Sequence, residues 1–462
     1  MAMDVVANTA KGTELSHMLK RSALRTAIVL VAALVFPALM AGGSTANASN
    51  PVIVIDVDSG KVLFSDRATD PWYPASITKL MTTYVALQAV QSGRVKMDTL
   101  LTVSQASASL PPSKIGFKPG TQVRLDNALK IIMVKSANDI ANTIAEGIGG
   151  STDNFVAMMN RTAQQLGMIN TRFVNPHGLP DERQQTSARD MAILGRALIL
   201  QYPEQNSLFH IGAIQLGRRV MHNTNGLIGR YPGADGMKTG FICASGFNVV
   251  ATATRGNKQL LTVILGAHSA NERTLLAANL FDRGFSTTSF LSPSLESLPS
   301  SNTVTPPNLR SLICEKRGPL AEDEDGAVTT NGNSDTNLAT FFGSSALAFS
   351  DGNAAPRATL GPRAKTQPEL VWTGLTPPAS REQAIAADTP KTKPLKGKAA
   401  TAKAPSSLPK AAINSDQKIK PGAKMSTSVK PVTGTSGKKA STAKPPSRPV
   451  KLVAPAPIIS TE

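Results

Sequence analysis

Regular hydrophobic patterning is confined to about half of this 462-residue chain, between residues 51 and 290. The last 72 residues, 391–462, contain no Phe, Tyr or Trp, ten prolines and 15 Lys or Arg. A segment of that composition cannot bury enough apolar surface to offset the entropy lost on folding. We therefore expect one globular domain over residues 49–290, a low-complexity linker over residues 291–390 and a disordered, basic C-terminal tail over residues 391–462.

The formal net charge of +18 belongs mainly to the tail. Residues 391–462 carry a net +13 and residues 1–48 a net +2, which leaves +3 for everything between. A nearly neutral domain lacks the basic surface that nucleic-acid binding requires, so we expect no nucleic-acid partner. The tail could bind anionic wall polymers or a membrane surface through its charge, or it could be only a flexible spacer.

The first 48 residues have the pattern of an export signal. A basic start at residues 20–25 precedes an apolar run at residues 27–40, and the sequence Ala-Asn-Ala follows at residues 46–48. These three zones are typical of a signal peptide over residues 1–48. The alternative is a membrane anchor, but the run contains Pro37 and is shorter than the roughly 20 residues that a spanning helix needs. We expect the mature protein to be exported to the periplasm or cell envelope.

Strand patterns lie at both ends of the domain, and most of the helix patterns lie between them. Hairpins are expected over residues 52–65 and 246–266, each with a glycine-containing turn. This order excludes regular βαβ alternation and favours an α+β fold, with an antiparallel sheet built from both ends of the domain, flanking helices and a helical lobe. The periodicity predicts helices over residues 76–91, 122–135, 138–147, 153–166, 188–200 and 272–283.

The first motif with chemical meaning is Ser76-Ile77-Thr78-Lys79, at the start of a predicted helix. Residues three apart share one helix face, so the Lys79 amine can stand beside the Ser76 hydroxyl. Burial would favour the neutral amine, which could accept the serine proton. The same spacing occurs four more times in the lysine-rich tail, where it follows from composition; only the Ser76 copy opens a helix in a patterned region.

Two further triplets are weak signals on their own. Ser136-Ala137-Asn138 places a hydroxyl and an amide between two predicted helices, where polar helix caps are an equally good explanation. Lys238-Thr239-Gly240 precedes a strand-like run over residues 241–250 and would suit a peptide that ends in a carboxylate. Its alternative is a hairpin turn with a solvated lysine.

Together, Ser-x-x-Lys, Ser-x-Asn and Lys-Thr-Gly in this order are the signature of β-lactamases and penicillin-binding proteins. The chain resembles the serine D-alanyl-D-alanine carboxypeptidases, the low-molecular-weight penicillin-binding proteins (peptidase family S11), over residues 51 to 285. Further blocks that carry the resemblance are residues 73–82, 175–179, 188–191 and 235–240. The resemblance implies a β-lactamase/transpeptidase-like fold and no cofactor or metal ion.

The resemblance also implies a role for each site residue. Ser76 would be the nucleophile that forms the acyl-enzyme, Lys79 its base, and Ser136 a proton relay. The substrate-binding residues would be Asn138, Lys238, Thr239, Gly240 and Phe241, with the backbone N–H groups of Ser76 and Phe241 as oxyanion hole. Peptidoglycan stem peptides ending in D-Ala-D-Ala would be substrates, and β-lactams would be covalent inhibitors. Ala137 and the Phe-Ile-Cys sequence after Gly240 depart from common family residues, which affects preferences near the leaving D-alanine.

The sequence is also compatible with other functions to different degrees. A β-lactamase should have a Glu-x-x-Leu-Asn loop between the second and third motifs, and residues 150–237 contain none. A D,D-endopeptidase acting on peptidoglycan crosslinks would use the same three motifs, and a non-catalytic wall-binding envelope protein would rely on its tail. The two cysteines, Cys243 and Cys314, are too few for a disulfide-stapled scaffold or a cysteine zinc site, and they could either pair or remain thiols.

Overall fold

The computed structural model describes residues 50–288, 291–315 and 360–387. The expected signal peptide and basic tail lie outside these residues. None of the helices within the described ranges has the length and apolar character needed to cross a membrane.

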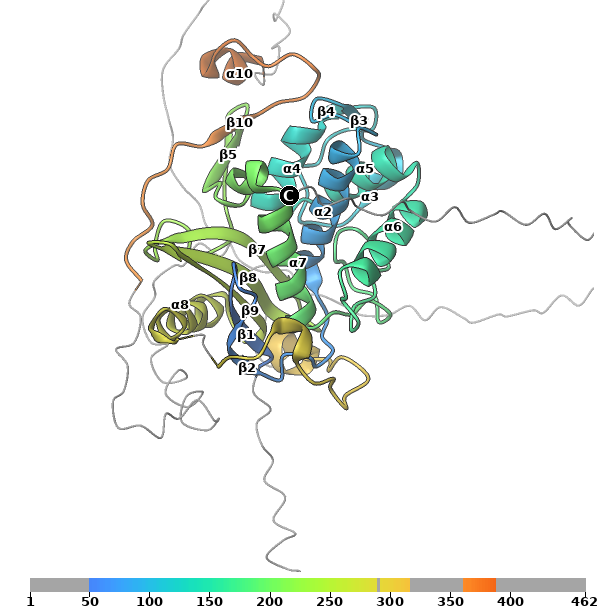
Figure 1. The fold of residues 1–462 in the computed structure, drawn as a ribbon. Helices are drawn as coiled ribbons and strands as arrows, with labels where there is room; N and C mark the ends of the chain where they lie inside the picture. The colour runs from blue at the N-terminus through green and yellow to red at the C-terminus, as the bar shows by residue number, and fades with distance from the viewer. Residues whose placement is uncertain (1–49, 289–290, 316–359, 388–462) are drawn as a thin grey trace, which may run out of the picture. The chain divides into compact units, whose positions relative to one another are not determined.

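A five-stranded antiparallel sheet joins the two ends of the domain, as the sequence predicted (Figure 1). The N-terminal hairpin pairs along β1 with the last strand of the C-terminal meander, so segments about 200 residues apart become neighbours. In sheet order, the strands are β2 (Val62–Asp66), β1 (Val52–Asp56), β9 (Lys258–Ala267), β8 (Gly246–Arg255) and β7 (Ala234–Ile242).

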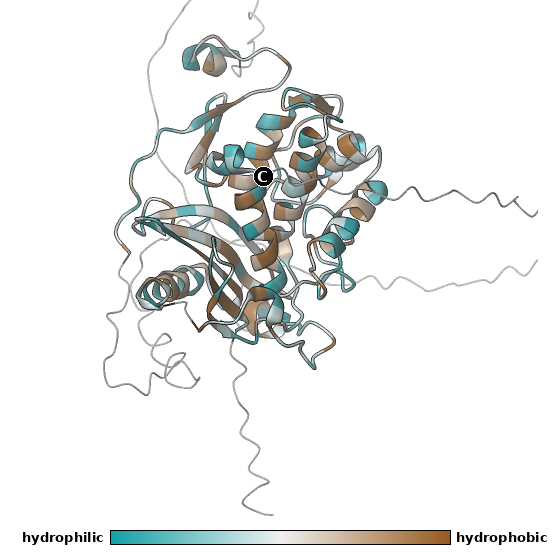
Figure 2. Ribbon diagram, viewed as in Figure 1, coloured by the Kyte–Doolittle hydropathy of each residue, from teal (hydrophilic) through white to brown (hydrophobic). Residues whose placement is uncertain are grey.

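Helices cover both faces of this sheet. Along β1, Val52 and Val54 belong to the core beneath α8 (Ala270–Ser286), whereas the alternate residues Ile53 and Ile55 face the main core. Because both faces are buried, the strands are apolar at nearly every position and do not alternate with polar residues. Figure 2 shows the resulting brown, apolar colour on the central strands and along the helix that packs on them, α7 (Ala188–Gln201).

The remaining helices form the lobe that the sequence predicted. α2 (Lys79–Gln91) runs through it and packs against α5 and α6. Serine side chains cap four of the described helices; one of them is Ser187, whose hydroxyl accepts from the Asp190 N–H at the start of α7. The other elements of the lobe are β3 (Leu100–Thr102), α3 (Gln105–Ser109), β4 (Gln122–Arg124), α4 (Leu125–Val134), α5 (Asn138–Gly149), α6 (Thr152–Gln165) and the 3₁₀ helix η2 (Pro203–Phe209).

Two predicted boundaries were wrong. The stretch 122–135 begins as strand β4, which pairs with β3, and becomes helical only at Leu125. The run 241–250 is not one strand, because a turn at residues 243–245 separates the end of β7 from β8. Local composition could not show either change, since each strand is defined by its pairing partner.

Within residues 291–390 the structure describes more order than the patterning predicted for a linker. Two short turns follow the domain, and a later segment adds a strand to the hairpin of β5 and β6, parallel to β5 (Figure 1). The elements are η3 (Leu295–Ser297), η4 (Ser311–Glu315), β10 (Glu369–Val371) and α10 (Arg381–Ala387), and the hairpin consists of β5 (Ala213–Leu216) and β6 (Arg219–His222).

The two cysteines form a disulfide. Cys243 follows the end of β7, and Cys314 lies in η4, with 5.8 Å between their Cα atoms. The same contact is supported by a hydrogen bond from the Leu309 N–H to the Ala244 carbonyl. The disulfide settles the question that the sequence left open, and it fastens residues 309–315 to the end of β7.

Candidate active site

Ser76 and Lys79 lie side by side at the start of α2. Ser76 belongs to the 3₁₀ helix η1 (Ala75–Thr78), which continues directly into α2 at Lys79. The Lys79 Nζ atom is 3.0 Å from the Ser76 Oγ atom. Lys79 is completely buried, whereas Ser76 is 9% exposed.

Two carbonyl oxygens hold the Lys79 side chain in place. Its Nζ donates to Asn138 Oδ1 at 2.9 Å and to the backbone oxygen of His177 at 2.6 Å. Neither oxygen can donate a hydrogen, so both contacts orient the amine in the same way whether it is charged or neutral. The amine is therefore fixed in direction, with the Ser76 hydroxyl as a third neighbour.

Ser136 and Asn138 come from the junction between α4 and α5. Ser136 has φ of +62°, a conformation that non-glycine residues rarely adopt and that is often found at functional sites. Its hydroxyl is buried and has no hydrogen-bond partner among the described residues. Both polar atoms of the Asn138 side chain are hydrogen-bonded: its Oδ1 accepts from Lys79, and its Nδ2 donates to the Pro111 carbonyl at 3.0 Å. A loop at residues 111–118 thus borders the site.

The Lys-Thr-Gly triplet lies inside β7, not in a turn. Lys238 is 1% exposed, which rules out the solvated lysine of the alternative reading. Its Nζ donates to the Thr239 carbonyl at 2.8 Å, and the Thr239 hydroxyl is 2.6 Å from the hydroxyl of Thr224.

Gly240 allows β7 to lie directly against η1. A Cβ atom at this position would be only 2.8 Å from the Ser76 nitrogen and 2.9 Å from the Ile77 nitrogen. The strand and the turn that carries Ser76 are therefore in backbone contact. The next residue, Phe241, stacks its ring on Phe247 with 4.2 Å between the centroids.

His177 contributes its backbone to the site and keeps its ring neutral. Burial, together with the charge of Lys79, lowers the pKa of His177 to about 3, and its Nδ1 accepts from the Leu179 N–H. Gly178, with φ of +86°, would place a Cβ atom 1.9 Å from the Ala75 carbonyl. The segment 175–179 thus packs against the turn that carries Ser76.

Reasoning from sequence missed three contributors: the His177 carbonyl, Thr224 and Asn248. Asn248 Nδ2 donates to the carbonyls of Tyr73 and Pro74, and its Oδ1 accepts from the Gly266 N–H. These bonds fasten the segment before Ser76 to the sheet. The sequence signal that could have identified Asn248 is a lone Asn within the apolar run of β8. The structure buries it completely, and buried amides require hydrogen-bond partners.

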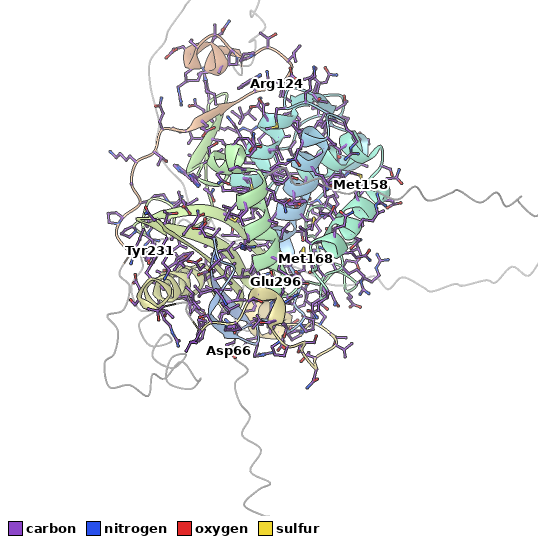
Figure 3. All side chains as sticks on the ribbon, in the orientation of Figure 1. Asp66, Arg124, Met158, Met168, Tyr231 and Glu296 are labelled. Atoms are coloured by element: carbon purple, nitrogen blue, oxygen red, sulfur yellow. A yellow bond between two sulfur atoms is a disulfide. The ribbon has the colours of Figure 1, made fainter. Side chains whose placement is uncertain are left out.

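The described residues contain no cluster of three or more His, Cys, Asp or Glu side chains able to hold a metal ion. The groups gathered around Ser76 are instead amines, hydroxyls and an amide. Figure 3 shows the side chains of all described segments on the ribbon.

Comparisons with known proteins agree with this geometry. Residues 40–269 match the family model described as D-alanyl-D-alanine carboxypeptidase. The chain is 35% identical over 246 residues to D-alanyl-D-alanine carboxypeptidase DacF of Bacillus subtilis, covering 52% of this chain and 63% of that protein. It is 31% identical over 244 residues to D-alanyl-D-alanine carboxypeptidase DacB2 of Mycobacterium tuberculosis, covering 50% of this chain and 81% of that protein.

Among solved structures, the chain is similar to penicillin binding protein 5 from Haemophilus influenzae, with 33% identity and a TM-score of 0.50. That match covers 52% of this chain and 71% of the other, and it confirms the expected penicillin-binding-protein fold. The chain spans less than two thirds of the length of the first curated relatives that it matches. These matches show that the chain, which carries Ser76, Lys79, Ser136, Asn138 and Lys238, belongs to the D-alanyl-D-alanine carboxypeptidase family, peptidase family S11.

Proposed function

We propose that the protein is a serine D-alanyl-D-alanine carboxypeptidase that removes the terminal D-alanine from peptidoglycan pentapeptides through an acyl-enzyme on Ser76. The observation that carries the proposal is the contact of the buried Lys79 amine with the Ser76 hydroxyl, 3.0 Å apart, beside a strand that presents Lys238 and Thr239. The relatives named as D-alanyl-D-alanine carboxypeptidases support the same activity.

Acylation begins with the neutral form of Lys79. Its two hydrogens point to Asn138 Oδ1 and the His177 carbonyl, which leaves the nitrogen lone pair facing the Ser76 hydroxyl. The amine accepts the hydroxyl proton while Oγ attacks the carbonyl carbon between the two D-alanines. When the tetrahedral intermediate collapses, the C–N bond breaks and the leaving nitrogen takes a proton, so free D-alanine departs with both electrons of that bond.

Two backbone N–H groups would form the oxyanion hole, one from each of the two segments that meet at Gly240. The N–H of Ser76 and the N–H of Phe241 would donate to the oxygen that becomes negative in the transition state. Lys238 and Thr239 would bind the carboxylate of the terminal D-alanine, because a buried cation and a hydroxyl on one strand complement that group. The Nδ2 group of Asn138 would donate to the carbonyl of the substrate amide, exchanging its bond to the Pro111 carbonyl for it, while Oδ1 keeps its contact with Lys79.

Deacylation needs a water activated at the same centre. Lys79 would again accept a proton, now from water that attacks the ester carbonyl, and the Ser76 oxygen would recover a hydrogen as it leaves. The hydroxyl of Ser136, which is buried and has no hydrogen-bond partner in the part of the chain that the structure describes, would relay protons to the leaving group. A β-lactam offers an amide carbonyl of the same kind, so penicillins should acylate Ser76 and inhibit the enzyme.

Release of D-alanine tests the activity. Wild-type protein should release D-alanine from a pentapeptide ending in D-Ala-D-Ala, and the Ser76→Ala variant should not. A fluorescent penicillin should label the wild type covalently and leave Ser76→Ala unlabelled. Absence of label and of D-alanine from folded wild-type protein would reject the proposal. Faster cleavage of a crosslinked muropeptide dimer than of the pentapeptide would instead assign a D,D-endopeptidase.

The substrate implies work outside the cytoplasmic membrane, in line with the export signal expected at residues 1–48. Export predicts a mature protein that begins at Ser49, which N-terminal sequencing of secreted protein would check. The basic tail at residues 391–462 would hold the enzyme near anionic wall or membrane surface. Co-sedimentation with purified cell walls should fall when the chain ends at residue 390, and equal sedimentation would reject this role.

A further inference from the structure

A cavity of about 640 Å³ is lined in part by residues 116–118 of the loop that borders the candidate active site, and its volume is in the size range of sites for small organic ligands. Three segments line it: the loop before β4, the β5–β6 hairpin, and the segment of residues 360–387, which we call the strap. The lining includes two aromatic rings, Phe117 and Trp372, and two cations, Lys118 and Arg219. No Asp or Glu is among the lining residues.

The strap is held by specific contacts with β4 and α4. The Gly374 N–H donates to the Gln122 carbonyl at 2.8 Å, and Asn127 Nδ2 donates to the Trp372 carbonyl at 3.2 Å. The guanidinium of Arg124, labelled near the strap in Figure 3, lies over the Trp372 ring at 5.6 Å. Trp372 therefore has a fixed position in the cavity wall, as a ligand platform requires.

The cavity and the active site share one wall. Asn138 bonds the carbonyls of Pro111 and Ser113, and the next residue, Asp139, accepts from the N–H groups of Ile115 and Gly116. Phe117 and Lys118 follow in the same loop and line the cavity. The loop thus runs from the catalytic amide to the cavity, and Arg219 of β6 reaches its far side, 3.5 Å from the Ile115 carbonyl.

The positions of the β7 residues, Asn138 and this loop give the direction in which a bound stem peptide would run. If Lys238 and Thr239 bind the C-terminal carboxylate and Asn138 binds the amide before the scissile bond, the rest of the stem leaves past Asn138. It then meets the loop at residues 111–118. The stem of peptidoglycan carries carboxylates along its length and is joined at its N-terminus to a muramic acid sugar, so it is acidic and ends in a pyranose ring.

We propose that this cavity is a second binding site for the acidic, sugar-bearing end of the peptidoglycan stem. Lys118 and Arg219 are both exposed and would pair with stem carboxylates, and the rings of Phe117 and Trp372 would pack on the sugar. The inference rests on the proposed function. The site depends on the strap, which lies beyond residues 40–269, where the family model matches.

A disaccharide tripeptide tests the cavity separately from catalysis, because it keeps the sugar and acidic residues but lacks D-Ala-D-Ala. The chain has two tryptophans, and Trp72 is 3% exposed, so ligand-dependent fluorescence should come mainly from Trp372. Titration of the full chain should show saturable binding. Arg219→Gln should weaken it at least fivefold, whereas Arg218→Gln, at the adjacent exposed position outside the lining, should change it less than twofold.

Kinetics on two substrates complete the test. Arg219→Gln should raise KM for a disaccharide pentapeptide about fivefold and leave kcat/KM for a short acyl-Lys-D-Ala-D-Ala peptide within twofold. Trp372→Ala should act likewise, and Trp372→Phe should retain most of the affinity because it keeps a ring. Absence of disaccharide tripeptide binding, or equal losses on both substrates, would overturn the cavity site. If neither substrate releases D-alanine, the proposed function fails, and the titration still decides the cavity.

Discussion

Replacing Gly240 with alanine probes the contact between β7 and η1, the turn that carries the proposed nucleophile Ser76. The added Cβ atom would lie 2.8 Å from the Ser76 nitrogen, 2.9 Å from the Ile77 nitrogen and 3.1 Å from the Pro74 oxygen. All three are backbone atoms, so no side chain can rotate to make room. The strand and η1 must therefore move apart.

The size of this movement sets the expected loss of activity. Ordinary contacts of a Cβ atom begin at about 3.4 Å, so a separation of about 0.6 Å is needed at the Ser76 nitrogen. A shift of that size lengthens an N–H···O bond from about 2.9 Å to about 3.5 Å, beyond the normal range. Loss of one oxyanion-hole donor typically lowers kcat by a factor of roughly 10² to 10³. We expect Gly240→Ala to lose at least about 100-fold in kcat/KM.

Gly236→Ala is the matched control. It lies on the same strand, and its Cβ atom would meet the Thr252 hydroxyl at 2.8 Å and the Phe209 Cβ at 3.1 Å, both side-chain atoms away from Ser76. We expect a similar fall in melting temperature for both variants, but D-alanine release within about threefold of wild type for Gly236→Ala. If Gly240→Ala keeps its kcat/KM within fivefold of wild type while folded, the proposed oxyanion hole is wrong.

Two further predictions concern stability. The fold holds His177 neutral with a pKa of about 3, whereas the unfolded chain protonates it below pH 6.5, so the free energy of unfolding should fall as pH drops from about 6.5 toward 3. The loss should reach about 2 kcal/mol by pH 5, and His177→Asn should flatten this slope in denaturant titrations while the exposed His222→Asn should not. The Cys243–Cys314 disulfide closes a separation of 71 residues, so reductant should lower wild-type stability by up to about 4 kcal/mol. Thermal scans of a double Cys→Ser variant should show no response to reductant, and an unchanged wild type would contradict the structural role.

The motif residues could be predicted because their chemistry is local in sequence. Ser76 and Lys79 share a helix face by spacing alone, and Lys238-Thr239-Gly240 precedes an apolar run that any sheet would recruit. The two-ended sheet was likewise visible, since the hairpins at 52–65 and 246–266 flank the helices. These features depend on periodicity and turn chemistry, which a single sequence contains.

Features that depend on distant partners could not be predicted. β10 has three residues, Glu369–Val371, and exists because it pairs with β5, about 150 positions earlier. In the sequence, Asn248 looks like an ordinary strand residue. Only the structure shows that its amide donates to the carbonyls of Tyr73 and Pro74, just before Ser76. The same holds for the beginning of β4, which propensity assigns to the following helix. In each case a tertiary contact overrides or supplies the local preference.

The region after residue 290 modifies the walls of a site that the family residues build. The disulfide ties η4 to the end of β7, just after Phe241, the proposed oxyanion residue. The strap contacts the other wall, at β4 and β5, beside the loop that bonds Asn138. Both attached segments, η4 and the strap, lie outside residues 40–269, where the family model matches, while the proposed catalytic groups lie inside it. We therefore expect η4 and the strap, more than the three motifs, to influence which stem the proposed enzyme prefers. Exchanging a motif residue should change the rate on every substrate, whereas changing the strap should alter which stem is preferred.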